Sequence, residues 1–312
     1  MGDIIPPRLR GKYFGIRNRA TGAVSLAAVL MGGFLLKAFQ QKQLDLVGFG
    51  VLFTLAFFFK YISYTIFKKH YSPRYKTRKA DAFSFKTFLK RKDNFTKFSI
   101  YQGFFYFAIM FASPFFAVYM LEELKFNYLT FTLVATSASA FYLVFTPIIG
   151  KFSDKFGNVK LFYLANALFV LTPIAWFFTK SPIVLIFVPQ LLAGLANAAL
   201  LLATTNFTYD NVTPRQRGTS IAYNNMLIGI GTFIGSLAGG AFIQYIPIPF
   251  SNAFFTIFGI AVVLRLLVGL IFLPQLKEQH ENIQPLPPLH IDITHPFKTL
   301  HAEISWLKSV SH

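Results

Sequence analysis

The sequence predicts an all-α membrane protein that crosses the bilayer eight times. Of its 312 residues, 54% are hydrophobic and only 13% are charged, whereas a soluble domain usually carries about 25% charged residues. In addition, the run 218–264 contains no Asp, Glu, Lys or Arg. As a single helix this run would extend about 70 Å, more than twice a ~30 Å hydrocarbon core. Pro247 and Pro249 lie near its middle and cannot continue a helix, so the run is two spans joined by a tight turn.

Eight apolar stretches are long enough to cross a bilayer. They lie near 20–38, 46–67, 99–121, 128–149, 161–179, 183–207, 220–245 and 251–273. Lys60 and Arg265 fall inside spans, each about two turns from the end that we predict to be cytoplasmic. We expect both side chains to snorkel to the membrane surface. No Asp or Glu falls in the middle of a predicted span, although proton-coupled transporters usually bury a carboxylate there.

The Lys and Arg residues are divided unevenly between the loops. If both termini are cytoplasmic, the inner segments contain 24 of the 30 basic residues and the outer loops contain four. Positive charge accumulates on the cytoplasmic side of membrane proteins. The sequence therefore predicts that both termini lie in the cytoplasm. The expected location of the protein is a bacterial-type inner membrane or plasma membrane.

The segment 68–97 contains eleven of the basic residues and accounts for much of the formal net charge of +18. Such a segment could bind anionic lipid headgroups. We favour the alternative that it is a cytoplasmic linker whose charge fixes the topology. No nucleic-acid-binding fold surrounds the segment, so nucleic acid is not an expected partner. The lipid bilayer is the partner expected from these features.

Neither a cofactor nor a catalytic centre is expected. The chain has no cysteine, which excludes a disulfide framework and a thiolate metal site. All six histidines lie in the basic segment or after residue 279, and their spacing fits no standard metal site. A membrane enzyme would need His, Asp, Glu or Cys grouped at a membrane face, so we expect a protein that is not an enzyme.

The opening segment is repeated at a constant offset of 207 residues. Pro7, Arg8, Arg10, Gly11, Asn18 and Gly22 fall on Pro214, Arg215, Arg217, Gly218, Asn225 and Gly229. The first copy precedes the first span and the second copy lies between the sixth and seventh, so six spans separate equivalent points. Parallel halves of six spans each are one plan of secondary transporters.

A second motif resembles that of a known protein family. The loop between the fourth and fifth spans reads GKFSDKFGNVK (150–160). It resembles the G-x-x-x-D-[RK]-x-G-[RK]-[RK] cytoplasmic loop of the major facilitator superfamily. Gly150, Asp154, Lys155 and Gly157 match this pattern, whereas Asn158 stands where a basic residue is expected. The P-x-x-R-G segments at 7–11 and 214–218 are also similar to a loop of this family, and the resemblance covers essentially all of 1–275.

The motif has a physical interpretation beside the resemblance. Its glycines allow a tight turn and close helix approach. Asp154 can accept hydrogen bonds from free N–H groups or pair with an arginine such as Arg215 or Arg217 on the same membrane face. We favour a cytoplasmic gate, and the alternative is a solvated turn that sets the topology. The gate candidates are Gly150, Asp154, Lys155, Gly157, Arg215, Arg217 and Gly218, with Arg8, Arg10 and Gly11 in the first copy of the repeat.

The resemblance implies a helical bundle of the major facilitator type, in which the eight spans are equivalent to helices five to twelve of twelve. We expect the C-terminal part of the N-terminal half at 1–67, a basic linker at 68–98, a complete C-terminal six-helix half at 99–275 and a cytoplasmic tail at 276–312. On this numbering the first four helices are absent. The implied function is secondary active transport of a small solute by alternating access. The alternatives are a non-transporting truncated remnant, a structural or regulatory membrane protein, and, less favoured, a membrane-embedded enzyme.

Two polar stripes are the candidates for the solute cavity. In this family the first and fourth helices of each half line the cavity, which implies the spans 99–121 and 183–207. Gln102, Tyr106 and Ser113 share one face of the first, and Gln190, Asn197 and Thr204 recur every seven residues on the second. Polar groups within a bilayer face the bundle or a cavity. The alternative is hydrogen bonding between helices with no ligand.

Overall fold

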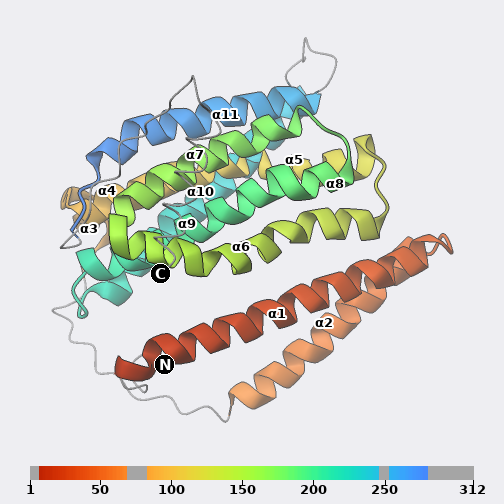
Figure 1. Ribbon diagram of the computed structural model, residues 1–312, viewed down its shortest axis with the longest axis horizontal. Coiled ribbons are helices and arrows are strands. Elements are labelled where there is room, and N and C mark those ends of the chain that lie inside the picture. The colour runs from red at the N-terminus through yellow and green to blue at the C-terminus, as the bar shows by residue number, and fades with distance from the viewer. Residues whose placement is uncertain (1–6, 69–82, 246–252, 280–312) are drawn as a thin grey trace, which may run out of the picture.

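The computed structural model describes residues 7–68, 83–245 and 253–279, and every regular element among them is a helix (Figure 1). Eight helical stretches in these residues are long and apolar enough to cross a membrane. They are Ala20–Gln40, Asp45–Phe67, Asn94–Glu123, Tyr128–Gly150, Asn158–Trp176, Pro182–Asn211, Arg217–Tyr245 and Ala253–Gln275. The prediction of an all-α bundle with eight spans is therefore confirmed.

The first two helices form a hairpin beside the other elements (Figure 1). Helix α1 (Pro7–Gln40) and helix α2 (Asp45–Phe67) are joined by a short turn, and α1 packs against α6 (Tyr128–Phe156). Because α1 begins at Pro7, the basic stretch that we read as a loop before the first span continues the helix instead. In α2 the one buried residue is Gly48.

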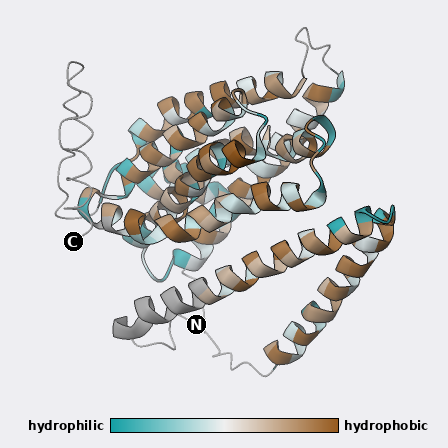
Figure 2. Ribbon diagram, turned by 45° about the vertical axis from the view of Figure 1, so that its right-hand side comes forward, coloured by the Kyte–Doolittle hydropathy of each residue, from teal (hydrophilic) through white to brown (hydrophobic). Residues whose placement is uncertain are grey.

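The apolar outer surface suits a lipid environment. In Figure 2 hydrophobic residues run along the lengths of the helices, whereas hydrophilic residues gather at their ends and in the α1–α2 turn. Phe53, Phe57 and Phe59 of α2 are all more than half exposed. Soluble monomers rarely expose apolar surface in continuous stretches of this kind, so this surface suits contact with hydrocarbon or with other apolar helices.

The remaining helices build one bundle. Their bounds are α3 Phe85–Lys90, α4 Asn94–Met110, α5 Ser113–Val118 with a π-helical continuation Tyr119–Glu123, α6 Tyr128–Phe156, α7 Asn158–Trp176, α8 Pro182–Leu185 with a π-helical continuation Ile186–Gln190, α9 Leu191–Asn211, α10 Arg217–Tyr245, and α11 Ala253–Phe272 with a final 3₁₀ turn Leu273–Gln275.

The local sequence accounts for several helix boundaries. Asp93 accepts a hydrogen bond from the N–H of Thr96 at 2.8 Å and so caps α4, and Asn127 caps α6 in the same way. The third span breaks between α4 and α5 just before Pro114, which has no N–H for the helix to use. Pro189 lies in the π-helical part of the sixth span, as expected where a proline disturbs the hydrogen-bond ladder.

Two clusters of aromatic side chains hold the bundle together. In the first, the ring of Phe98 lies 5.1 Å from that of Phe162 and 4.9 Å from that of Phe207, which joins α4, α7 and α9. In the second, Phe116 stacks on Phe258 with ring centroids 4.2 Å apart. Phe116 is partly buried and the other four are buried, because they lie on the faces that the helices turn toward one another.

Helix α10 packs closely against α4 along a stripe of glycines. A Cβ atom added at Gly231, Gly235 or Gly239 would overlap the backbone of Gly103, Phe107 or Phe111, respectively. Only a residue without a side chain allows the two backbones to come this close. Their spacing of four residues keeps the three glycines on one face of α10, so this face has a packing role.

Residues 83–98 are the described C-terminal end of the predicted linker 68–98, and they are not a simple loop between helices. They contain the short helix α3, and α4 begins at Asn94, five residues before the span predicted at 99. Phe88 of α3 is buried, and the hydroxyl of Tyr223 on α10 donates to the carbonyl of Phe83 at 2.6 Å. This end of the segment is therefore docked on the bundle, whereas residues 69–82 lie outside the described part of the chain.

Candidate functional site

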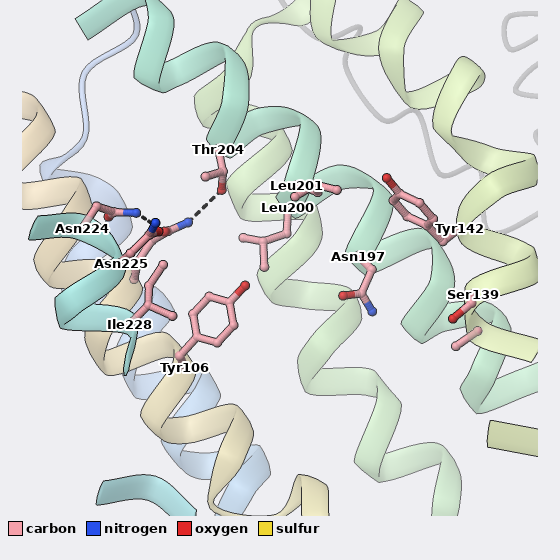
Figure 3. A pocket seen from close by; sticks show the side chains of 12 residues that line it. Tyr106, Ser139, Tyr142, Asn197, Leu200, Leu201, Thr204, Asn224, Asn225 and Ile228 are labelled. Atoms are coloured by element: carbon pink, nitrogen blue, oxygen red, sulfur yellow. Dashed lines mark hydrogen bonds between the residues drawn. The ribbon is translucent and has the colours of Figure 1, made fainter. Parts of the chain in front are cut away.

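A cavity of about 470 Å³ lies between α4, α6, α9 and α10. In Figure 3 side chains from α10 and α4 stand on one side, those of α6 on the other, and those of α9 between them. The lining residues are Gln102, Tyr106, Ala138, Ser139, Tyr142, Asn197, Leu200, Leu201, Thr204, Asn224, Asn225 and Ile228. Most of the polar groups among them are amides and hydroxyls, which suit a polar organic solute.

A second cavity of about 300 Å³ continues the first. The two share Tyr106, Ala138, Asn197 and Leu200 on their walls. The second reaches between α5, α7 and α11, where it meets Ser113, Trp176 and Arg265. Together they form one path along the inner faces of the bundle, lined by polar and apolar side chains.

All six residues predicted for the cavity line one or both of these spaces. Gln102 and Thr204 line the first, Ser113 and Gln190 line the second, and Tyr106 and Asn197 line both. The helical spacing thus placed them on the correct faces. Their contact with a solute stays a prediction.

The hydrogen bonds divide these residues into two kinds. Gln102 is 1% exposed, and its Nε2 donates to the hydroxyl of Thr204 at 2.7 Å. Its Oε1 accepts from Nδ2 of Asn224 at 3.1 Å, so Gln102 joins α4 to α9 and α10. Asn197 is exposed and bonds only its own helix, through the carbonyl of Ala193 at 2.7 Å. The interhelical alternative therefore describes Gln102, whereas Asn197 offers its carbonyl oxygen to the cavity.

Sequence reasoning missed part of the walls. Asn224 and Asn225 of α10 line the first cavity, as do Ser139 and Tyr142 of α6. Two adjacent asparagines inside a long uncharged run were a signal, because amides within a bilayer need partners or water. On α6 the hydroxyl residues are too frequent for their spacing to distinguish cavity positions from lipid-facing ones.

Arg265 does not snorkel, and this prediction was wrong. The side chain is 2% exposed, within the bundle. Its Nη1 donates to the carbonyl of Phe169 at 2.7 Å, and its Nη2 donates to the carbonyl of Ile109 at 3.3 Å. Pro173 lies four residues after Phe169, and a proline has no N–H to bond that carbonyl. The guanidinium therefore satisfies an acceptor that the proline leaves free. Lys60, by contrast, is exposed on α2.

At one end of the bundle, Gly157 makes the tight turn between α6 and α7. Its φ of 90° lies in the left-handed region that glycine adopts readily. A Cβ there would also lie 2.5 Å from Oε2 of Glu278. The same carboxylate oxygen accepts from the N–H of Val159 at 2.7 Å, in the first turn of α7, where a negative charge is favoured. Glu278 thus binds a free helix N–H, a role that we had considered for Asp154.

Asn158, where the sequence departs from the family pattern, lies in a buried polar network. Its Oδ1 accepts from the hydroxyl of Ser153 at 2.7 Å, and its Nδ2 donates to Oδ2 of Asp210 at 3.1 Å. Nδ2 of Asn206 donates to the Ser153 hydroxyl at 3.1 Å. The network fastens the α6–α7 turn to the end of α9.

The arginines after α9 can be described without Asp154, whose pairing with either of them stays a prediction. Nη2 of Arg217 donates to the carbonyls of Tyr209 at 3.4 Å and Val212 at 3.0 Å, and its guanidinium lies 4.4 Å from the centre of the Tyr209 ring. It therefore satisfies free carbonyls at the end of α9. Arg215 is exposed.

The structure describes three of the other gate candidates. A Cβ added at Gly150 or Gly218 would meet nothing within 4 Å, so the close helix approach expected of the motif glycines is wrong at Gly150. Nζ of Lys155 lies 5.6 Å from the ring centre of neighbouring Phe156. The side chains of Asp154, Arg8 and Arg10, and the surroundings of Gly11, lie outside the described part of the structure, as do residues 280–312 of the predicted tail.

The comparisons with known proteins agree on one family. Residues 98–307 match the family described as the Major Facilitator Superfamily. The vacuolar basic amino acid transporter 2 of Saccharomyces cerevisiae is 31% identical over 114 residues, which cover 36% of this chain and 23% of that protein. Multidrug resistance protein 1 of Bacillus subtilis is 27% identical over 127 residues, covering 40% of this chain and 32% of that protein. Multidrug resistance protein 2 of the same organism is 28% identical over 98 residues, covering 31% and 24%. The chain thus matches less than a third of the length of each of these relatives.

Proposed function

Because the chain belongs to the Major Facilitator Superfamily, we propose that it works in secondary transport of a small organic solute, by alternating access through the two connected cavities. One observation carries the proposal. Amides and hydroxyls from four separate helices converge on a cavity of about 470 Å³ within a bundle whose outer surface is apolar. Buried polar groups of this kind mark solute pathways in membrane proteins.

The internal repeat supports the arrangement of the helices. The six-span offset between its two copies makes α1 and α2 the fifth and sixth helices of a first half, and α4 to α11 the second half. Alternating access would then involve movement of α1 against α6, where these two parts are in contact. The excess of Lys and Arg in the inner segments supports cytoplasmic termini.

We also propose that the α6–α7 turn is part of a cytoplasmic gate. Asn158 and Glu278 tie this turn to the end of α9 and to the segment after α11. A change in the angle between these helices would have to break such contacts, so they favour one conformation over the other. The names of the relatives point to organic solutes such as amino acids and drugs, and we take these as the first classes to test.

Uptake into proteoliposomes tests the proposal. The chain, with any segment that its gene encodes before or after it, is reconstituted and presented with labelled amino acids and cationic and anionic drugs. Asn197→Leu removes an amide whose carbonyl oxygen faces the cavity, and Thr205→Val is the control on the same helix, because Thr205 is exposed and bonds its own helix. We expect about tenfold slower uptake for Asn197→Leu, corresponding to one hydrogen bond to the solute of about 1.4 kcal/mol, and unchanged uptake for the control. Equal uptake by both variants would refute the assignment of the cavity.

A further inference from the structure

The second cavity contains a positive charge for which the described residues supply no counter-charge. Arg265 lines this cavity near the middle of α11. Within the described part of the chain no carboxylate pairs with its guanidinium, whose hydrogen bonds go to two backbone carbonyls. Its Nε–H has no hydrogen-bond partner. A guanidinium inside the hydrocarbon region is costly, and such residues are retained where they pair with something.

The two carbonyls explain the position of the side chain but leave its charge unbalanced. Neutral acceptors replace part of the lost hydration, whereas only an anion removes the net charge. The planar fork of an arginine presents several N–H groups in the geometry of a carboxylate. Arg265 is 2% exposed but belongs to the wall of this open space, so an anion in the cavity would approach the guanidinium at its edge.

The rest of the wall favours an anion with an aromatic or apolar body. The rings of Phe116 and Trp176 line the cavity with their centroids 4.9 Å apart. Ser113 and Gln190 add a hydroxyl and an amide. A volume of about 300 Å³ is at the lower end of small-molecule sites, so it suits a small aromatic acid.

We propose that the second cavity binds the carboxylate of a small aromatic acid, with its oxygens on Arg265 and its ring against Phe116 and Trp176. The inference rests on the proposed function, since the bound acid would be the transported solute. The binding itself can be measured without transport. If the acid does not bind, the acid site is refuted while transport of a neutral solute is unaffected. If the acid binds but is not taken up, the proposed transport is refuted while the acid site stands.

Tryptophan fluorescence reports on this cavity directly. The chain has two tryptophans, Trp176 in the cavity wall and Trp306 near the C-terminus. In a Trp306→Phe background in nonionic detergent, 4-nitrobenzoate is titrated as the quenching probe, with 4-nitrobenzamide as its neutral analogue. We expect saturable quenching of Trp176, with a Kd at least about tenfold lower for the acid than for the amide. Equal Kd values, or no saturable quenching by the acid, would overturn the proposal.

Two further variants separate the charge from the fold. Arg265→Gln should abolish the preference for the acid, whereas Lys60→Gln, which removes an exposed charge from another span, should keep it. If Arg265→Gln does not fold, Ala193→Leu provides the second test, because it fills the cavity and leaves the guanidinium and its carbonyl partners in place. Retention of tight acid binding by either Arg265→Gln or Ala193→Leu would refute the site.

Discussion

The contact between α4 and α10 gives a prediction for which the change in the free energy of unfolding can be worked out from the structure. In Gly235→Ala the new Cβ would overlap the carbonyl oxygen of Phe107 and lie 3.0 Å from its Cα. Both obstacles are backbone atoms, so a helix has to shift rather than a side chain. Gly229→Ala is the matched control on the same helix, where a Cβ meets nothing within 4 Å.

The difference between these two variants isolates the overlap. Each gains up to about 1 kcal/mol of helix propensity from alanine, and this gain cancels in the comparison. Overpacking a well-packed interface costs about 1–3 kcal/mol, and we take the upper value because the backbone is rigid. We therefore expect Gly235→Ala to be about 2 kcal/mol less stable than the parent and about 3 kcal/mol less stable than Gly229→Ala.

In a Trp306→Phe background, unfolding by SDS followed by the fluorescence of buried Trp176 measures both free energies. Because the two variants carry the same chemical change, differences in detergent binding are small. Stabilities within about 0.5 kcal/mol of each other, the usual range for surface substitutions, would show that α4 and α10 do not pack as described.

Three further changes test the α6–α7 turn by thermal unfolding. Gly157→Ala should cost about 1–3 kcal/mol, because alanine is strained at a φ of 90°, whereas Gly150→Ala, facing open space, should cost nothing; equal melting temperatures would contradict this. Asn158→Ala should cost about 1–3 kcal/mol by leaving its buried partners unsatisfied, and an unchanged midpoint would mean that the network contributes nothing. Glu278→Gln should lose about 0.3–1 kcal/mol from the first turn of α7, and the loss should shrink as salt is added; a loss independent of salt would point to shape rather than charge.

The sequence was sufficient for the spans and for the polar faces of two helices. Length and hydropathy determine what can cross a bilayer, and helical spacing alone puts Gln102 and Tyr106 on the same face. Both side chains line the first cavity. The glycine stripe of α10 was predictable for the same reason, because its spacing of four residues keeps Gly231, Gly235 and Gly239 on one side.

The sequence was insufficient where a partner is a backbone group far along the chain. The burial of Arg265 depends on a carbonyl on α7 that Pro173 leaves free, and hydropathy contains no information about which helix faces that carbonyl. Glu278 binds the start of α7 from beyond the last span, so no local motif indicates it. Docking of α3 on Tyr223 was missed because its charged residues obscured the buried Phe88.

The central claim is that water and solute reach the cavity wall at mid-membrane depth. The chain has no cysteine, so a single introduced thiol can be followed without background. Asn197→Cys lies on the cavity wall, and Phe233→Cys lies near the middle of α10 at a residue that is 65% exposed on the apolar surface. Reaction with a charged, membrane-impermeant methanethiosulfonate needs an ionised thiol in contact with water.

In vesicles we predict that the thiol at position 197 reacts at least about tenfold faster than the one at position 233, since only the former meets water. Alternating access further predicts that position 197 reacts with reagent applied from either side of the membrane. Equal and slow reaction at both positions would contradict the claim that these helices enclose a solute pathway.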